Sequence, residues 1–276
     1  MTVYIYIAAG AIAVFTIIMI VFMRREAGRP VLETVRLTAS DDGLRVVQLS
    51  DIHIKRNCIP IEEVLTLVNS AAPDVVVFTG DYIESSKDVG PFLSWIGALI
   101  ESARGAAFYL CYGNHDAKVF SYNPRLRRDF TKALKRLGVY VLENRTVVRA
   151  FNGKLYAITG FSDYYSTPPY DARAAMGGIP KDAYRHIGMS HNPDVALDIR
   201  GARPDLLLLG HFHGGQIWLP FGVEYACLRK ERLCKAGVRR GLYEYGGRRI
   251  YISRGLGCVL FPLRFRSRPE ITLLIV

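Results

Sequence analysis

The sequence predicts an α/β fold, and three features indicate it. Short apolar runs that fit buried strands alternate along the chain with segments whose apolar residues recur at helical spacing. Several of these apolar runs end abruptly in Gly, Asp, Asn or His. Because ligand sites of α/β proteins lie at the carboxyl ends of strands, such endings indicate function rather than packing. A chain of 276 residues, 50% of them hydrophobic, is also long enough for one large domain with an appendage.

The appendage is the first apolar run, which has the length of a membrane span. Residues 3–23 carry no charge and match the roughly 20 residues that cross a bilayer as a helix. A buried core helix and a cleaved signal peptide are the alternatives, but a signal peptide has its basic residues before the apolar run. Here Arg24, Arg25 and Arg29 follow it. We therefore expect residues 1–24 to form an uncleaved, single-pass anchor in the inner (plasma) membrane, with the rest of the chain in the cytoplasm.

The segment after the anchor is expected to be short and partly irregular. Residues 25–43 read as a linker and an edge strand that turns at Ser40–Gly43 into a hairpin. From residue 44 strands and helices alternate, with Gly113–Asp116 as a short polar loop. Strands are expected at Leu44–Leu49, Asp74–Thr79 and Ala106–Tyr112, and helices after Pro60, at Pro91–Ala103 and from Leu126 to Leu137.

The helix that ends before Gly138 has one strongly basic face. This face carries Arg125, Arg127, Arg128, Lys132, Lys135 and Arg136. A solvated face is the simpler interpretation, and contact with anionic lipid is the alternative.

The second half of the chain continues the alternation. Strands are expected at Lys154–Thr159, Arg185–Ser190, Asp205–Leu209 and Ile271–Val276, a helix from Asn192–Asp194, and a hairpin through Gly246–Gly247. Residues 163–184 form a longer loop with Tyr164, Tyr165 and Tyr170, and long loops of this kind are often functional lids.

Five strand endings carry potential metal ligands. They are Asp51-x-His53, Gly80-Asp81, Gly113-Asn114-His115-Asp116, His191 and Gly210-His211-x-His213. Any one of them occurs by chance, and Gly113–Asp116 alone fits an ordinary polar turn. Five in order, each after an apolar run, favour a metal site, and only His186 remains as a structural or surface histidine. Mixed imidazole and oxygen ligands suit Mn, Fe or Zn better than Ca.

These motifs resemble the signature of the calcineurin-like metallophosphoesterase superfamily, which runs DxH, GD, GNH(D/E), H and GHxH. The resemblance covers residues 44–276 and implies a four-layer αββα sandwich for this domain. With the anchor and the Gly210–Gln216 run, it extends to a membrane-anchored bacterial subgroup. That subgroup includes YaeI- and YkuE-like phosphodiesterases and chlamydial-type UDP-2,3-diacylglucosamine pyrophosphatases.

The resemblance implies two divalent metal ions, of which Mn is favoured. Asp51, His53 and His213 would hold one ion, Asn114, His191 and His211 the second, and the Asp81 carboxylate would bridge them. His115 would face the scissile phosphate, oriented by Asp116, and the alternative for Asp116 is a carboxylate that caps the loop.

The implied activity is hydrolysis of a phosphodiester or pyrophosphate bond by a hydroxide that two metal ions activate. The anchor, the net charge of +11 and the apolar tail Leu256–Phe265, with Arg264, Arg266 and Arg268, favour a lipid-linked nucleotide at an anionic membrane surface. UDP-2,3-diacylglucosamine, of the lipid A pathway, is the favoured substrate, and the alternative for the tail is that Val259, Leu260 and Phe261 are simply core.

Other functions remain open at this point. A general phosphodiesterase or nuclease could use Tyr164, Tyr165 and Tyr170 as stacking platforms, so nucleic acid is not excluded. A catalytically silent scaffold is a remote alternative, because every signature residue is present. The five cysteines include no CxxC pair, which indicates a reducing compartment, with a Cys227–Cys234 disulfide disfavoured. The sequence identifies no protein partner.

Overall fold

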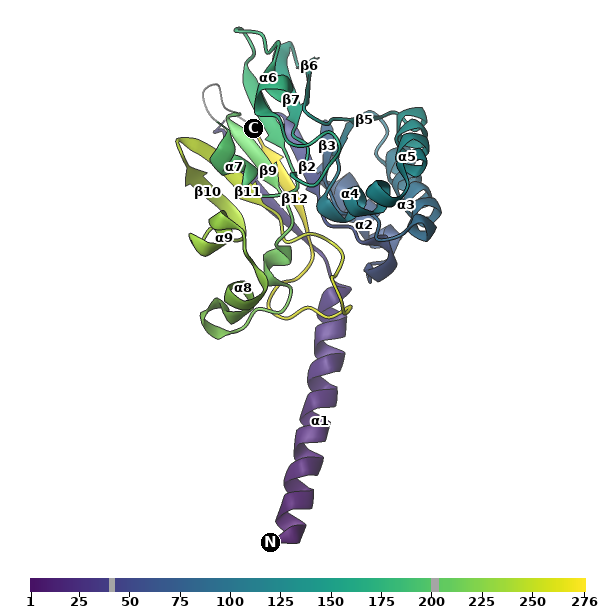
Figure 1. The fold of residues 1–276 in the computed structure, drawn as a ribbon, viewed down its shortest axis with the longest axis vertical. Helices are drawn as coiled ribbons and strands as arrows, with labels where there is room; N and C mark the ends of the chain where they lie inside the picture. Colours follow the sequence, from purple (N-terminus) through teal and green to yellow (C-terminus); the bar gives the residue numbers. More distant parts are fainter. Residues whose placement is uncertain (40–42, 200–203) are drawn as a thin grey trace.

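The computed structural model describes residues 1–39, 43–199 and 204–276, and it shows two six-stranded sheets packed face to face (Figure 1). Helices cover the outer face of each sheet, so the body has four layers, and the predicted α/β fold is confirmed. Residues 40–42 of the turn expected at Ser40–Gly43 lie outside the described residues.

The first sheet is mainly parallel and holds the first three candidate ligand motifs. Its strands, in spatial order, are β1 (Val31–Arg36), β12 (Glu270–Ile275), β2 (Arg45–Leu49), β3 (Val75–Thr79), β4 (Ala107–Cys111) and β5 (Val139–Val141). The expected hairpin between β1 and β2 is wrong. β12 lies between these strands, parallel to β1 and antiparallel to β2, so the edge strand pairs with the end of the chain.

The second sheet has a parallel centre between two antiparallel edge strands. Its strands, in spatial order, are β10 (Gly241–Tyr245), β11 (Arg248–Ile252), β9 (Leu206–Leu209), β8 (Arg185–Met189), β7 (Lys154–Gly160) and β6 (Arg145–Phe151). The predicted hairpin through Gly246–Gly247 is confirmed as the β10–β11 pair. β5 and β6 were not expected, since β5 has three residues and β6 has neither a continuous apolar run nor a regular alternation of polar and apolar residues.

Both sheets are apolar on both faces, because each one packs against the other sheet on its inner face and against helices on its outer face. In β9, Leu206 and Leu208 point into the core between the sheets, whereas Leu207 and Leu209 point into the core beneath the outer helices. The outer helices of the first sheet are α2 (Ile61–Ala71), α3 (Val89–Ser102), α4 (Asn114–Tyr122) and α5 (Pro124–Arg136). Those beside the second are α6 (Ala172–Met176), α7 (Val195–Asp198), α8 (Val223–Leu228) and α9 (Arg232–Lys235).

Two segments expected to be loops contain helices. Residues 163–184 include α6, and Asn114 is the first residue of α4, so Gly113–Asp116 is a strand-to-helix turn rather than a polar loop. The described residues also include four 3-10 turns: η1 (Ile54–Arg56), η2 (Ser86–Asp88), η3 (His213–Gly215) and η4 (Pro220–Gly222). None of the five cysteines, all of them described, forms a disulfide.

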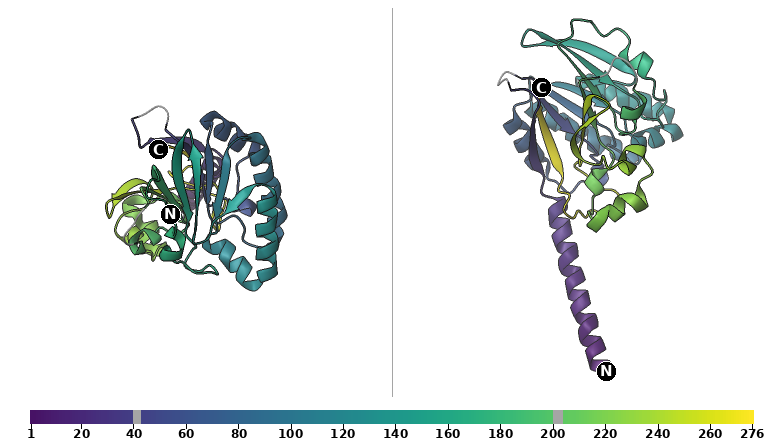
Figure 2. Two further views of the ribbon diagram at one scale, coloured as in Figure 1. Left: turned by 90° about the horizontal axis from the view of Figure 1, so that it is seen from above. Right: turned by 90° about the vertical axis from the view of Figure 1, so that its left-hand side faces the viewer.

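Helix α1 (Thr2–Ala27) projects from one end of the body (Figure 2). It is long and apolar enough to cross a membrane, and its most apolar stretch is wholly unburied, which excludes the core-helix alternative. Its last turn is fixed to the body, since Met23 O accepts a hydrogen bond from Arg264 N at 3.0 Å. The basic helix α5 lies on the side of the body, away from the end where α1 joins it (Figure 1).

Candidate metal centre

The candidate ligands converge from the carboxyl ends of five parallel strands, three in one sheet and two in the other. β2, β3 and β4 lead to Asp51, Asp81 and Asn114, and β8 and β9 lead to His191 and His211. Left-handed backbone, which is costly for residues other than glycine, concentrates here. It occurs at Asp51, His53, Asp81, His211 and His213, with φ between 41° and 76°. These strained turns aim the side chains at a common point.

The glycines of the motifs leave room for the ligands. A Cβ at Gly113 would lie 2.2 Å from Asp81 Oδ1, and one at Gly210 would lie 2.7 Å from Asp51 Oδ2. Gly113 has φ of −100°, so any residue could adopt its backbone conformation. Gly113 is therefore required for the close approach of Asp81, and not for a left-handed backbone conformation.

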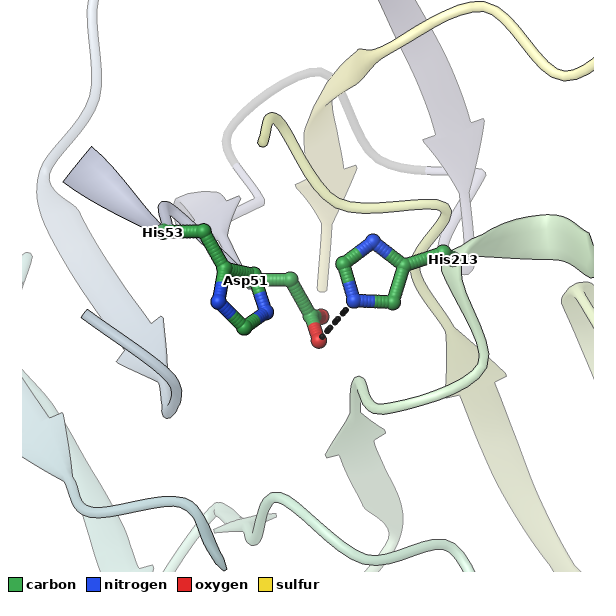
Figure 3. A group of neighbouring side chains, drawn as sticks. All are labelled: Asp51, His53 and His213. Carbon is green, nitrogen blue, oxygen red and sulfur yellow. Dashed lines mark ion pairs between the residues drawn. The ribbon is translucent and has the colours of Figure 1, made fainter. Parts of the chain in front are cut away.

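One group of possible ligands consists of Asp51, His53 and His213, whose ligand atoms lie within 4.8 Å of one another (Figure 3). All three residues are buried. His213 Nε2 lies 3.2 Å from Asp51 Oδ1. His53 Nδ1 lies 3.2 Å from Glu84 Oε1 and Nε2 lies 3.7 Å from Asp81 Oδ2, yet neither nitrogen makes a hydrogen bond of acceptable geometry with any described residue.

A second group consists of Asp81, His191 and His211, also within 4.8 Å. His191 Nε2 lies 3.1 Å from Asp81 Oδ2 and 3.0 Å from His211 Nδ1. The other nitrogen of His191, Nδ1, lies 2.8 Å from Thr79 O and must donate to it, because a carbonyl oxygen only accepts. This bond leaves Nε2 of the neutral ring as the atom with a lone pair for a cation.

The electrostatics of the two groups match a site built for positive charge. Burial would raise the pKa of the Asp81 carboxyl, but His191 beside it holds that pKa well below its ordinary value. Burial would likewise lower the pKa of His191, but Asp81 and Asp51 raise it to about 10. A proton on His191 thus balances the carboxylates, and a cation bound here would replace that proton.

Asn114 and His213 test whether these residues fit metal ions. The Asn114 Oδ1 atom is buried and has no hydrogen-bond partner in the described part of the chain, and the same holds for His213 Nδ1. Buried polar atoms without partners are rare and costly, which points to an absent ligand. With two carboxylates, one amide oxygen and several imidazoles, the donor set suits divalent transition metals. The residues present therefore fit a dinuclear site.

His115 lies beside the first group and is accompanied by a residue that the sequence did not single out. His115, His53 and Glu84 form a third group of possible ligands, and the His53 and His115 rings are 5.0 Å apart. Glu84 also forms an ion pair with Arg56. Burial lowers the pKa of His115, which favours the neutral imidazole.

Asp116 does not orient His115, so that prediction is wrong. No hydrogen bond joins the two side chains among the described residues, and both carboxyl oxygens of Asp116 accept backbone N–H groups instead. The donors are Asp81 N and Gly113 N to Oδ2, both at 2.9 Å, and Tyr82 N and Ile83 N to Oδ1, at 2.9 and 3.1 Å. Asp116 therefore ties the turn after β3 to the turn after β4, which is the capping alternative.

Replacement of Asp116 by Ala should destabilise the protein by about 3 kcal/mol, because it leaves four buried N–H groups without an acceptor. The thermal midpoint of the metal-free protein should fall by roughly 6–12 °C. Asp129→Ala, at an exposed position of α5, is the matched control and should change the midpoint little. Equal midpoints for the two variants would contradict the capping role.

Glu231 is a second carboxylate that the sequence gave no reason to select. Its Oε1 atom lies 2.8 Å from His211 Nε2, so Nδ1 of that ring faces His191 and Asp81. Burial would raise the pKa of Glu231, but His211 lowers it to about 2. Carboxylate partners of this kind fix the orientation of metal-binding histidines. Glu231 precedes α9 in a basic stretch without periodicity, so no sequence pattern marks it.

Comparison with known proteins gives the same assignment as the geometry. Residues 44–215 match the family model described as calcineurin-like phosphoesterase. The chain is 32% identical to the uncharacterized metallophosphoesterase YkuE of Bacillus subtilis, with 84% of this chain and 78% of YkuE covered. It is 30% identical to the phosphodiesterase YaeI of Escherichia coli, with 83% and 81% covered.

A third relative has a named lipid-pathway activity. The chain is 27% identical to the UDP-2,3-diacylglucosamine pyrophosphatase LpxG of Chlamydia trachomatis, over 84% of this chain and 83% of LpxG. Residues 44–215, which match the family model, include the strands and turns that carry the candidate ligands. The chain is a hydrolase and belongs to the calcineurin-like phosphoesterase family.

Proposed function

We propose that the protein hydrolyses a phosphodiester or pyrophosphate bond of a membrane lipid derivative, using two divalent metal ions, with Mn favoured. The observation that carries the proposal is the pair of ligand groups, Asp51–His53–His213 and Asp81–His191–His211, next to the unpaired Oδ1 of Asn114. Asp51, His53 and His213 would hold one ion. Asn114, His191 and His211 would hold the second, and Asp81, which lies next to both groups, would be the bridging carboxylate.

When bound, the ions supply Lewis acidity that polarises a phosphoryl oxygen and acidifies water. The chain's own residues then position the substrate. His115 donates its backbone N–H to Asp81 Oδ1 at 2.9 Å, which holds its backbone next to the bridging carboxylate, and its ring lies 5.0 Å from the His53 ring. A neutral His115 donates a hydrogen bond to a phosphoryl oxygen or a proton to the leaving oxygen.

The membrane location rests on α1 and on apolar side chains beside its base. The segments around residue 260 and before α8 lie next to the end of α1 in both views (Figures 1 and 2). Leu260 and Phe261 are 71% and 65% exposed, so the alternative that they are simply core is wrong, and Phe221 is fully exposed. Exposed apolar side chains beside the base of α1 suit the interface region of a bilayer. The basic face of α5 lies elsewhere, which favours its solvated interpretation.

The favoured substrate is UDP-2,3-diacylglucosamine, supported by the membrane-proximal site and by the likeness to LpxG. The test is a metal-loaded assay of the full chain on this lipid, on bis-p-nitrophenyl phosphate and on single-stranded DNA. Preferential cleavage of the lipid supports the proposal, and activity on the simple diester alone overturns the lipid substrate.

A general phosphodiesterase or nuclease is the second candidate, and Tyr165 is the observation in its favour. Tyr165 is 74% exposed and lines a pocket with Asn114 and Lys118, where a base could stack. Tyr164 and Tyr170 pack against the second sheet instead, so they do not extend such a platform. Cleavage of DNA at a rate above that of the lipid would favour this candidate.

Glu231→Gln should weaken metal binding about 10- to 100-fold, because the variant loses the charge that orients His211. Isothermal titration with Mn²⁺ measures this affinity without any assay of turnover. Glu62→Gln, in the first turn of α2, is the control and should bind like the wild type. An unchanged affinity in Glu231→Gln would contradict the role of this carboxylate.

The carboxyl terminus should lie in the cytoplasm, because the basic residues Arg24, Arg25 and Arg29 follow the span and basic residues next to a span stay on the cytoplasmic side. A reporter that fluoresces only in the cytoplasm, fused to Val276, should therefore be fluorescent. A fusion that scores only with a periplasmic or extracellular reporter would refute the orientation.

A further inference from the structure

A groove of about 290 Å³ opens at the metal centre and has two kinds of lining. Four polar residues, Arg56, Glu84, His115 and Lys118, form one part, and two of them belong to the third ligand group. Val119, Tyr122, Val259 and Leu260 form the other part. The lining therefore passes from groups that suit a phosphate to groups that suit a hydrocarbon.

The polar part can accept an anion although it contains a carboxylate. Glu84 is neutralised by its ion pair with Arg56. Lys118 is exposed and has no ion-pair partner among the described residues. An ammonium beside His115 is a suitable contact for a phosphate ester.

The apolar wall is a preformed structure. Gln216 follows His213 by three residues, and the two hydrogens of its Nε2 amide are shared among Val259 O, Phe261 O and Leu263 O, at 3.0 to 3.1 Å. Its Oε1 atom accepts a bond from Val259 N at 2.7 Å. One side chain thus fixes the loop that carries Leu260 relative to the metal centre, and it holds Leu260 in a left-handed conformation with φ of 62°.

The same loop reaches the membrane anchor. Arg264 N bonds to Met23 O, and the Phe265 ring lies 6.2 Å from the Phe22 ring at the end of the span. The buried Arg264 guanidinium bonds to backbone carbonyls, among them Gly255 O and Ser267 O at 3.1 and 3.0 Å. The loop that forms the outer part of the groove therefore lies beside the end of the candidate membrane span.

We propose that this groove binds the hydrocarbon chain of a lipid phosphate ester, which enters from the bilayer past Leu260 with its phosphate toward His115 and Lys118. The inference rests on the proposed function and names the substrate part that this site selects. Leu260 is then a specificity-determining residue, although it touches no reacting atom.

The test uses two p-nitrophenyl phosphodiesters that differ only in a methyl or a hexyl group, with the full chain in lipid nanodiscs and Mn²⁺. We expect kcat/KM for the hexyl ester to exceed that for the methyl ester at least about tenfold, because each methylene in an apolar pocket raises it. Leu260→Asn should reduce the hexyl-over-methyl preference about fivefold or more, because the loss of an apolar contact with the chain is worth about one methylene. Asn tolerates the left-handed backbone at this position.

Phe261→Asn is the matched control, because Phe261 is exposed on the same loop but does not line the groove. It should keep the hexyl preference, which separates the groove from simple partition of the ester into the nanodisc. Tyr122→Ser is a second groove variant, at an exposed position of α4, and should also lose preference. No hexyl preference in the wild type, or an unchanged preference in Leu260→Asn, overturns the groove. Failure to hydrolyse either ester overturns the proposed hydrolysis itself.

Discussion

Asp81→Asn should lower kcat/KM for any substrate at least about 1,000-fold, a loss of about 4 kcal/mol of transition-state stabilisation. Asp81 lies next to both ligand groups, with Oδ2 3.1 Å from His191 Nε2 and 3.7 Å from His53 Nε2. An amide in its place has one oxygen and no charge, so it cannot offset the repulsion between two cations. The measurement is metal content by mass spectrometry together with turnover of a simple diester.

The matched control for Asp81→Asn is Asp163→Asn, a buried carboxyl near the centre that belongs to no ligand group in the described part of the chain. It should keep its metal. A fully loaded Asp81→Asn protein with wild-type turnover would show that this carboxylate does not bridge.

His115→Ala should reduce kcat about 100- to 1,000-fold while metal content stays at the wild-type level. The reason is that the imidazole stabilises charge on the phosphate or protonates the leaving oxygen. The comparison of turnover with metal content separates this role from ligation, which the position of His115 beside His53 and Glu84 also permits.

His115→Asn is the informative second variant, because an amide still donates a hydrogen bond but cannot transfer a proton. If charge stabilisation dominates, His115→Asn should recover part of the lost rate, and if proton transfer dominates, it should resemble His115→Ala. Near-full turnover in His115→Ala would contradict the proposed role of this residue. Loss of metal from the same variant would make it a ligand instead.

The sequence predicted the central strands and the strand-end residues because both signals are local. A strand that is buried on both faces can be recognised from a run of about five apolar residues. A polar turn directly after the run marks the edge of the sheet where parallel strands place ligands. Asp51, Asp81 and His191 could therefore be selected before their neighbours in space were known. The same reasoning failed for β1, whose partner β12 is more than 200 residues away in the chain.

The residues that hold the candidate ligands and the nearby loop in place could not be predicted, because their contacts depend on tertiary structure. The direction of the Asp116 side chain depends on where α4 begins. The start of this helix places the carboxyl group next to four backbone N–H groups rather than next to His115. Glu84 and Glu231 reach histidines from distant segments without any spacing rule. Gln216 lies close to the His211 and His213 motif, but its bonds to the loop at Leu260 depend on tertiary structure.

The central claim is that Asp81 joins two metal ions in one site, and electron paramagnetic resonance of the Mn²⁺-loaded protein tests it most directly. Ions that share a carboxylate lie about 3.5–4 Å apart and are magnetically coupled. We predict the spectrum of an exchange-coupled pair at two equivalents of Mn²⁺, and its loss in Asp81→Asn. A spectrum of isolated ions alone, at full loading of the wild-type protein, would contradict the dinuclear centre.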